Sequence, residues 1–132
     1  MSSFDFSLSY VIYASPSRVY DAITRQDVLM QWIEGEAIFE YEEGGKVELF
    51  DKWVSGEVVM LEKDKALTFT WKPNTWSKNA KPSYVTLLLE EHPAGTEVTV
   101  EHSGFTNAEE AANHEKGWVD FYFEPLNDYF TQ

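Results

Sequence analysis

The sequence predicts an α+β domain in which a curved antiparallel sheet of about seven strands wraps around a long C-terminal helix, with two short helices between strands 1 and 2. Three observations lead to this fold class. An alternating apolar segment opens the chain, short β-like runs fill its middle, and a helical stripe of apolar residues closes it. With 132 residues, 43% of them apolar, the chain is expected to form a single domain over residues 1–132.

The N-terminal segment is expected to form the first strand and both short helices. Apolar side chains occupy alternate positions from Phe4 to Ile12, which is the period of a strand with one buried face. Ser15 is a favourable N-cap before Pro16 at the first helical position. Asp27 is expected to cap a second short helix, which stops at Gly35.

The middle of the chain is expected to form six further strands, because short runs rich in Val, Phe, Trp and Thr alternate with turn residues. Tight turns such as Gly44-Gly45 favour hairpins and therefore an antiparallel meander. One longer polar connection, Lys72 to Pro82, carries Trp76, which is expected to be exposed. The six strands are roughly Glu36 to Tyr41, Lys46 to Phe50, Val54 to Glu62, Ala66 to Trp71, Ser83 to Glu91 and Thr96 to Ser103.

The C-terminal segment is expected to form the long helix. Thr106 and Glu109 have the spacing of a capping box, in which each side chain bonds to the other's free backbone N–H. From Trp118 to Phe130 the apolar residues are three and four apart, so they form a stripe that must pack on the sheet. Pro125 removes a backbone donor, which predicts a bend near Tyr122.

The composition excludes several function classes. Ten Lys and Arg against 23 Asp and Glu leave a net charge of −13, which disfavours nucleic acids and membrane surfaces as partners. The chain has no cysteine, which excludes thiol chemistry and suggests the cytoplasm. No basic leader or long apolar run indicates export or membrane anchoring. His92 and His114 lack metal-site spacing, so neither a metal nor another cofactor is expected.

Short motifs in a characteristic order resemble the START-like superfamily, also called SRPBCC or birch-pollen-allergen-like, which has the helix-grip fold. The branch they most resemble is related to the C-terminal domain of activators of heat-shock-protein ATPase. That resemblance spans nearly the whole chain and implies a cavity between sheet and helix. It leaves the role open, because similar proteins include lipid and hormone binders, cyclases and cochaperone domains. The residues that carry it are Ser15-Pro16, Val19 to Ile23, Leu29, Trp32, Gly44-Gly45-Lys46, Gly56-Glu57-Val58, Leu67 to Trp71, Gly95-Thr96, Val98, Val100, His102 to Phe105, Gly117-Trp118 and Leu126.

Strand alternation sorts the apolar residues into faces that are expected to point inward. Ala37, Phe39 and Tyr41 share one such face. These side chains either pack the core or line a ligand cavity, and both interpretations stay open here. The candidate cavity-lining residues are Phe39, Leu49, Val58, Phe69, Trp71, Val85, Leu87, Val100, His102, Trp118 and Tyr122.

His102 is the titratable residue that alternation places among inward apolar positions. It could orient a ligand or move a proton, or it could be a structural histidine bonded to a neighbouring group. Ser103 cannot be its partner, because adjacent strand residues point to opposite faces. If His102 faces a cavity, a Phe at this position should leave the fold intact while weakening polar ligands.

Three functions follow as hypotheses. The first is non-enzymatic binding of a small hydrophobic or amphipathic molecule in the cavity, by a monomer or a homodimer. The second, implied only by the resemblance, is a chaperone-interaction module similar to heat-shock ATPase activators. The third is a cyclase- or hydrolase-like enzyme that uses His102, although no nucleophile motif supports it and no catalytic residue is assigned.

Overall fold

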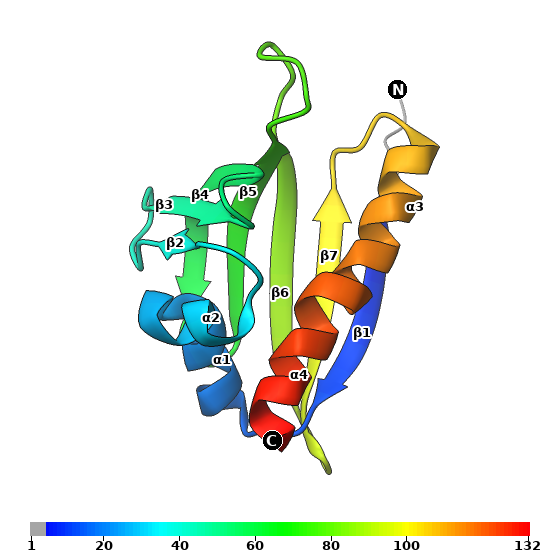
Figure 1. Cartoon of the computed structure of the whole chain (residues 1–132). Helices are drawn as coiled ribbons and strands as arrows, with labels where there is room; N and C mark the ends of the chain where they lie inside the picture. Colours follow the sequence, from blue (N-terminus) through cyan, green and yellow to red (C-terminus); the bar gives the residue numbers. More distant parts are fainter. Residues whose placement is uncertain (1–4) are drawn as a thin grey trace.

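The structure, a computed structural model, describes residues 5–132 and confirms the predicted helix-grip arrangement (Figure 1). One seven-stranded antiparallel sheet has the strand order β1-β7-β6-β5-β4-β3-β2. Phe4, the first residue of the predicted first strand, lies outside the described residues. The elements are β1 (Phe6–Ile12), α1 (Pro16–Thr24), α2 (Gln26–Trp32), β2 (Ile38–Phe39), β3 (Lys46–Leu49), β4 (Val54–Glu62), β5 (Ala66–Pro73), β6 (Ser83–His92), β7 (Gly95–Ser103), α3 (Ala108–Gly117), the π-helical segment η1 (Trp118–Phe123) and α4 (Glu124–Thr131).

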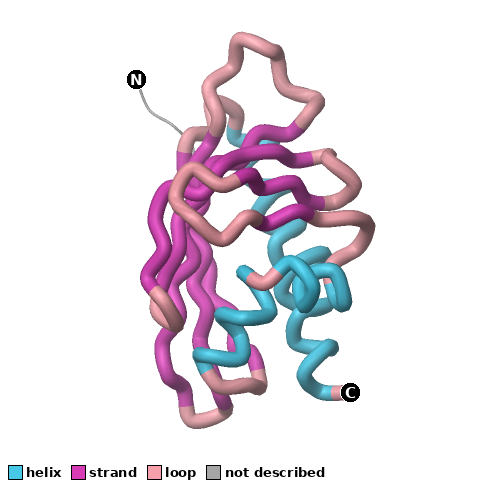
Figure 2. Tube along the Cα trace, turned by 90° about the vertical axis from the view of Figure 1, so that its left-hand side faces the viewer, coloured by secondary structure: helices cyan, strands magenta, loops and turns pink. Residues whose placement is uncertain are grey.

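The sheet curves around the C-terminal helix. Figure 1 shows the short strands β2 and β3 running across the direction of the long strands β6 and β7, and Figure 2 shows the helices gathered on one side of the sheet. The bend falls on β4, where the pairing with β5 shifts register between Val58 and Met60. Gly56 allows a close approach there, because a Cβ atom at this position would lie 1.9 Å from the Thr70 carbonyl oxygen.

The C-terminal helix is continuous from α3 through η1 to α4, and its irregular part coincides with the predicted bend. Pro125 cannot donate a backbone hydrogen bond. In the wider π-helical turn the Glu124 N–H bonds to the Val119 carbonyl, which is five residues back. The widened turn places three aromatic rings in the core, those of Trp118, Tyr122 and Phe123, which are buried against the sheet.

The helix ends differ from the predicted caps. Asn107, rather than Thr106, caps α3, and its side chain accepts hydrogen bonds from the backbone N–H groups of Glu109 and Glu110. The cap lies one residue further along because an Asn carbonyl oxygen reaches these two N–H groups directly. Ser15 occupies the N-cap of α1 as predicted, but its side chain makes no cap hydrogen bond. Asp27 lies in the first turn of α2 instead of capping it.

Two aromatic side chains differ from their predicted exposure. Tyr41 was expected to face inward but is 49% exposed, because β2 ends at Phe39 and the strand alternation stops with it. Its hydroxyl reaches the buried Tyr20 hydroxyl at 3.0 Å. Trp76 is half-buried rather than exposed, since its indole N–H donates to Glu110 Oε1 at 2.7 Å. The loop between β5 and β6 is thereby tied to α3.

Candidate functional site

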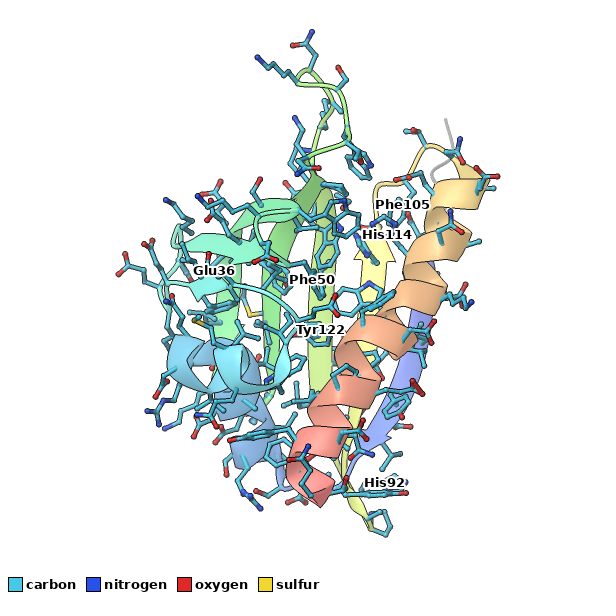
Figure 3. The ribbon with its side chains drawn as sticks, in the orientation of Figure 1. Glu36, Phe50, His92, Phe105, His114 and Tyr122 are labelled. Atoms are coloured by element: carbon cyan, nitrogen blue, oxygen red, sulfur yellow. The ribbon has the colours of Figure 1, made fainter. Side chains whose placement is uncertain are left out.

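An aromatic pocket opens between the β3–β4 loop, the end of β5 and one face of the C-terminal helix. Figure 3 shows Phe50, His114 and Tyr122 gathered where these elements meet. The pocket volume is about 400 Å³, within the range of small-molecule sites. The lining residues are Phe50, Trp53, Trp71, Glu110, Asn113, His114, Gly117, Trp118, Phe121 and Tyr122.

The loop between β3 and β4 forms one wall in an unusual backbone conformation. Phe50, Asp51 and Lys52 have φ values of 56°, 57° and 69°, which is the left-handed region that non-glycine residues seldom occupy. Paired hydrogen bonds hold this turn: the Glu36 N–H donates to Asp51 Oδ1 at 2.8 Å, and the Asp51 N–H donates to the Glu36 carbonyl at 3.1 Å. The turn presents the Trp53 ring, which stacks on His114 at 5.9 Å.

A buried hydrogen-bonded chain underlies the pocket and fixes the state of His102. The Trp118 indole N–H donates to His102 Nδ1 at 3.1 Å. An indole can only donate, so Nδ1 carries no proton and Nε2 carries it. His102 Nε2 therefore donates to Ser83 Oγ at 2.9 Å, and Ser83 Oγ donates to the Trp71 carbonyl at 2.6 Å. Both His102 nitrogens, the Trp118 indole N–H and the Ser83 hydroxyl are thus all hydrogen-bonded.

A second chain of the same kind fixes His114. The Trp71 indole N–H donates to His114 Nε2 at 3.1 Å, so the proton of the neutral ring lies on Nδ1. His114 Nδ1 then donates to the Glu110 carbonyl at 3.0 Å. The two imidazole rings lie 5.4 Å apart, edge to face. Each indole N–H thus occupies an imidazole lone pair.

The surroundings keep both histidines neutral. Burial, with a smaller contribution from the neighbouring His114, lowers the pKa of His102 to about 3. Burial also lowers the pKa of His114, although its bond to the Glu110 carbonyl partly opposes the shift. His102 has no exposed surface, and both of its nitrogens are bonded. It therefore has no free nitrogen with which to accept a proton from a bound molecule.

The structure separates the eleven candidate residues into two groups. Trp71, Trp118 and Tyr122 line the pocket. The other eight are buried in the core and are not among its lining residues: Phe39, Leu49, Val58, Phe69, Val85, Leu87, Val100 and His102. The first seven of these pack as an apolar cluster, whereas His102 lies in the hydrogen-bonded layer beneath the pocket.

Several residues of the site were missed by sequence reasoning. Ser83 bonds to His102 from the neighbouring strand, two residues from the direct partner Val85. No local pattern reveals such a diagonal pair. A signal did exist on the helix, because the lining residues from Glu110 to Phe121 recur at spacings of three and four. These residues lie on one face of the helix. The apolar stripe begins only at Trp118, so it did not show that this face reaches back to Glu110.

The pocket wall carries little charge, and that charge is negative. Glu110 is its sole charged lining residue, and one of its carboxylate oxygens is engaged by Trp76. Among residues 5–132, no group of three His, Asp or Glu side chains lies close enough to hold a metal ion. Within the same range, no helix has the length and hydropathy to cross a bilayer.

The sequence profile of the family described as activator of Hsp90 ATPase homolog 1-like protein matches residues 13–131. The chain belongs to this family. The matched range takes in all the lining residues of the pocket.

Among curated relatives of this AHSA1-like chain, the human activator of 90 kDa heat shock protein ATPase homolog 1 is 27% identical over 124 residues, covering 94% of this chain and 36% of that protein. The Dictyostelium discoideum activator homolog is 28% identical over 105 residues, covering 79% of this chain and 27% of that protein. The chain thus spans about a third of the length of the curated relatives it matches.

Solved structures share the same architecture. A Mesorhizobium loti protein, MLL2253, superposes with a TM-score of 0.82 at 25% identity and covers 96% of each chain. An HSP90 activator from Plasmodium falciparum superposes with a TM-score of 0.80 at 20% identity, covering 98% of this chain and 96% of that chain. At that identity, the second likeness concerns the fold alone.

Proposed function

We propose that this chain is a non-enzymatic binder of a small hydrophobic or amphipathic molecule, held in the aromatic pocket between the sheet and the C-terminal helix. The observation that carries the proposal is the unfilled volume of about 400 Å³ beside three indole rings, those of Trp53, Trp71 and Trp118. Apolar and aromatic walls with few polar groups are typical of sites for small molecules. The absence of cysteine supports a cytoplasmic location for the domain.

The environment of the histidines supports binding without catalysis. An enzyme that used His102 or His114 would need an imidazole nitrogen free to exchange a proton with the substrate. Indole N–H groups occupy Nδ1 of His102 and Nε2 of His114, and the remaining nitrogens donate to protein oxygens. A fully hydrogen-bonded buried network of this kind holds its side chains rigidly, which suits a binding pocket more than proton transfer.

Filling the pocket from Gly117 is expected to abolish binding while preserving the fold. Gly117 lines the pocket in a helical conformation, and a Cβ atom there would meet only Phe121 at an ordinary 3.9 Å. Gly117→Leu should therefore extend its side chain into the pocket, and the helix should gain about 0.5–1 kcal/mol from the loss of glycine. Nile red, a neutral apolar dye, is expected to raise the melting temperature of the wild type but not of this variant.

Gly117→Ala is the matched control. It has the same gain in helix propensity but adds only one carbon, so the dye should still raise its melting temperature. If the dye shifts Gly117→Leu as much as Gly117→Ala, the dye binds elsewhere. If it shifts neither the wild type nor the control, binding in this pocket is contradicted.

A second candidate function is contact with an Hsp90-type chaperone, and family membership is the observation that favours it. A protein with a net charge of −13 would recognise a basic patch on such a partner, and the contact would weaken with salt. Because the binding proposal requires no chaperone, we expect stoichiometric addition of this protein to leave the ATPase rate of an Hsp90 unchanged. A salt-sensitive acceleration would favour the second function instead.

A further inference from the structure

The hydroxyl group of Tyr122 is a polar group at the pocket wall without a partner among residues 5–132. The Tyr122 side chain is 3% exposed and lines the pocket, yet its hydroxyl forms no hydrogen bond with any residue from 5 to 132. Buried hydroxyls are normally bonded. In this chain the buried Tyr20 hydroxyl bonds to Tyr41, and the Tyr129 hydroxyl bonds to Gln31. The Tyr122 hydroxyl differs from both: it has no partner among residues 5–132 and its oxygen is not sealed from solvent, so it is open to a molecule in the pocket.

The ring of Tyr122 is held on two sides, which fixes its hydroxyl at the pocket wall. Trp32 meets the ring at 4.9 Å and 87°, and Trp118 meets it at 4.7 Å and 63°. Both are edge-to-face contacts, the favourable geometry for aromatic pairs. Burial raises the pKa of Tyr122, so the hydroxyl keeps its proton and remains a donor. Figure 3 shows the side chain between helix and sheet, below Phe50 and His114.

The remaining polar groups of the pocket narrow the ligand chemistry further. The lining includes no Lys or Arg, and Glu110 is its single charged residue. A carboxylate or sulfate in this pocket would lose its hydration without gaining a cation and would meet the negative charge of Glu110. Anionic ligands are therefore disfavoured, and fatty acids are among them. The indole walls favour flat rings, which stack on them.

We propose that Tyr122 is the recognition donor of the pocket and that its ligand is a neutral, planar aromatic molecule carrying a hydrogen-bond acceptor such as a ketone. This inference rests on the proposed binding function and narrows it. The acceptor bonds to the Tyr122 hydroxyl while the ring system lies among the indoles of Trp53, Trp71 and Trp118. Such a bond gives the Tyr122 hydroxyl the partner that residues 5–132 do not provide.

Three naphthalenes of nearly equal size and shape test the inference by calorimetric titration: 2-acetylnaphthalene, 2-isopropenylnaphthalene and 2-naphthoate. Tyr122→Phe removes only the hydroxyl oxygen. We expect it to weaken 2-acetylnaphthalene by about three- to tenfold and to leave 2-isopropenylnaphthalene within about twofold. Comparing variants, rather than ligands, cancels the different hydration of the two probes. For the wild type, 2-naphthoate should bind most weakly.

Tyr129→Phe is the matched control, because it removes a hydroxyl from a tyrosine that does not line the pocket. It should leave the affinity for all three probes unchanged. Equal effects of Tyr122→Phe on the ketone and the alkene would overturn the donor role, and so would tightest binding of 2-naphthoate. If the alkene binds while the ketone shows no dependence on Tyr122, the pocket binds ligands but this inference fails. If none of the three binds the wild type, the binding function itself is contradicted.

Discussion

Replacing His102 by Phe is expected to lower the free energy of unfolding by about 2–4 kcal/mol at pH 7.5. The substitution leaves the buried indole N–H of Trp118 without an acceptor, which costs about 1–3 kcal/mol. The larger ring adds strain, because His102 is completely buried and Phe105 lies 4.5 Å away between ring centres. The inward position of His102 suggested that a Phe would be tolerated, and its hydrogen bonds revise that expectation.

Urea denaturation of the two proteins measures this loss. His92→Gln is the control, since His92 is the histidine outside the buried network and accepts only a turn hydrogen bond from Ala94. We expect the control to lose less than about 1 kcal/mol. A His102→Phe protein as stable as the wild type would contradict the structural role, because it would mean that the Trp118 N–H needs no partner.

Acidification is expected to destabilise the folded protein through the two buried histidines, His102 and His114. In the unfolded chain a histidine has a pKa near 6.5, whereas burial holds the pKa of His102 at about 3 in the folded protein. The unfolded state therefore binds the proton first. The stabilisation is complete above about pH 6.5 and is lost as the pH falls from there toward about 3. Between pH 7.5 and 5, His102 alone should account for a loss of about 2 kcal/mol.

His102→Phe separates this effect from other titrations. The variant cannot bind the proton at position 102, so its stability should fall less steeply between pH 7.5 and 5. The stability difference between wild type and variant should therefore shrink by about 2 kcal/mol over that range. Parallel pH profiles would show that His102 has the same pKa in the folded and unfolded states, contrary to its burial.

Most of the fold could be predicted from local patterns, because the spacing of apolar residues distinguishes strands from helices and identifies the buried face of each. The alternation in β5 and β6 identified Leu67, Phe69, Val85 and Leu87, all of which are buried. The predictions failed where the chain departs from regular periodicity. Tyr41 lies beyond a two-residue strand, and the cap of α3 depends on which of two adjacent polar residues reaches the free N–H groups. The spacing of apolar residues predicts neither the end of β2 nor the residue that caps α3.

The site was less predictable, because contacts between distant segments define it. The spacing of His114 indicates only that it is no metal ligand, because its function as an acceptor depends on Trp71, which is 43 residues away in sequence. The pocket wall formed by Phe50 and Trp53 depends on three residues in the left-handed region, held by a carboxylate that bonds to Glu36. Of these three, only Asp51 is of a residue type enriched in that conformation, so the sequence does not predict the turn. The inward position of His102 was predictable, whereas its tautomer and partners required the three-dimensional arrangement.

The central claim, that the aromatic pocket binds a small neutral molecule, is tested most directly by following the indole N–H resonances during an NMR titration with 2-acetylnaphthalene. The chain has five tryptophans, and Trp53, Trp71 and Trp118 line the pocket whereas Trp32 does not. We expect saturable shifts of those three indole signals and a much smaller shift of the Trp32 signal. Unchanged signals for all three pocket indoles at saturating ligand, or a response confined to Trp32, would contradict the claim.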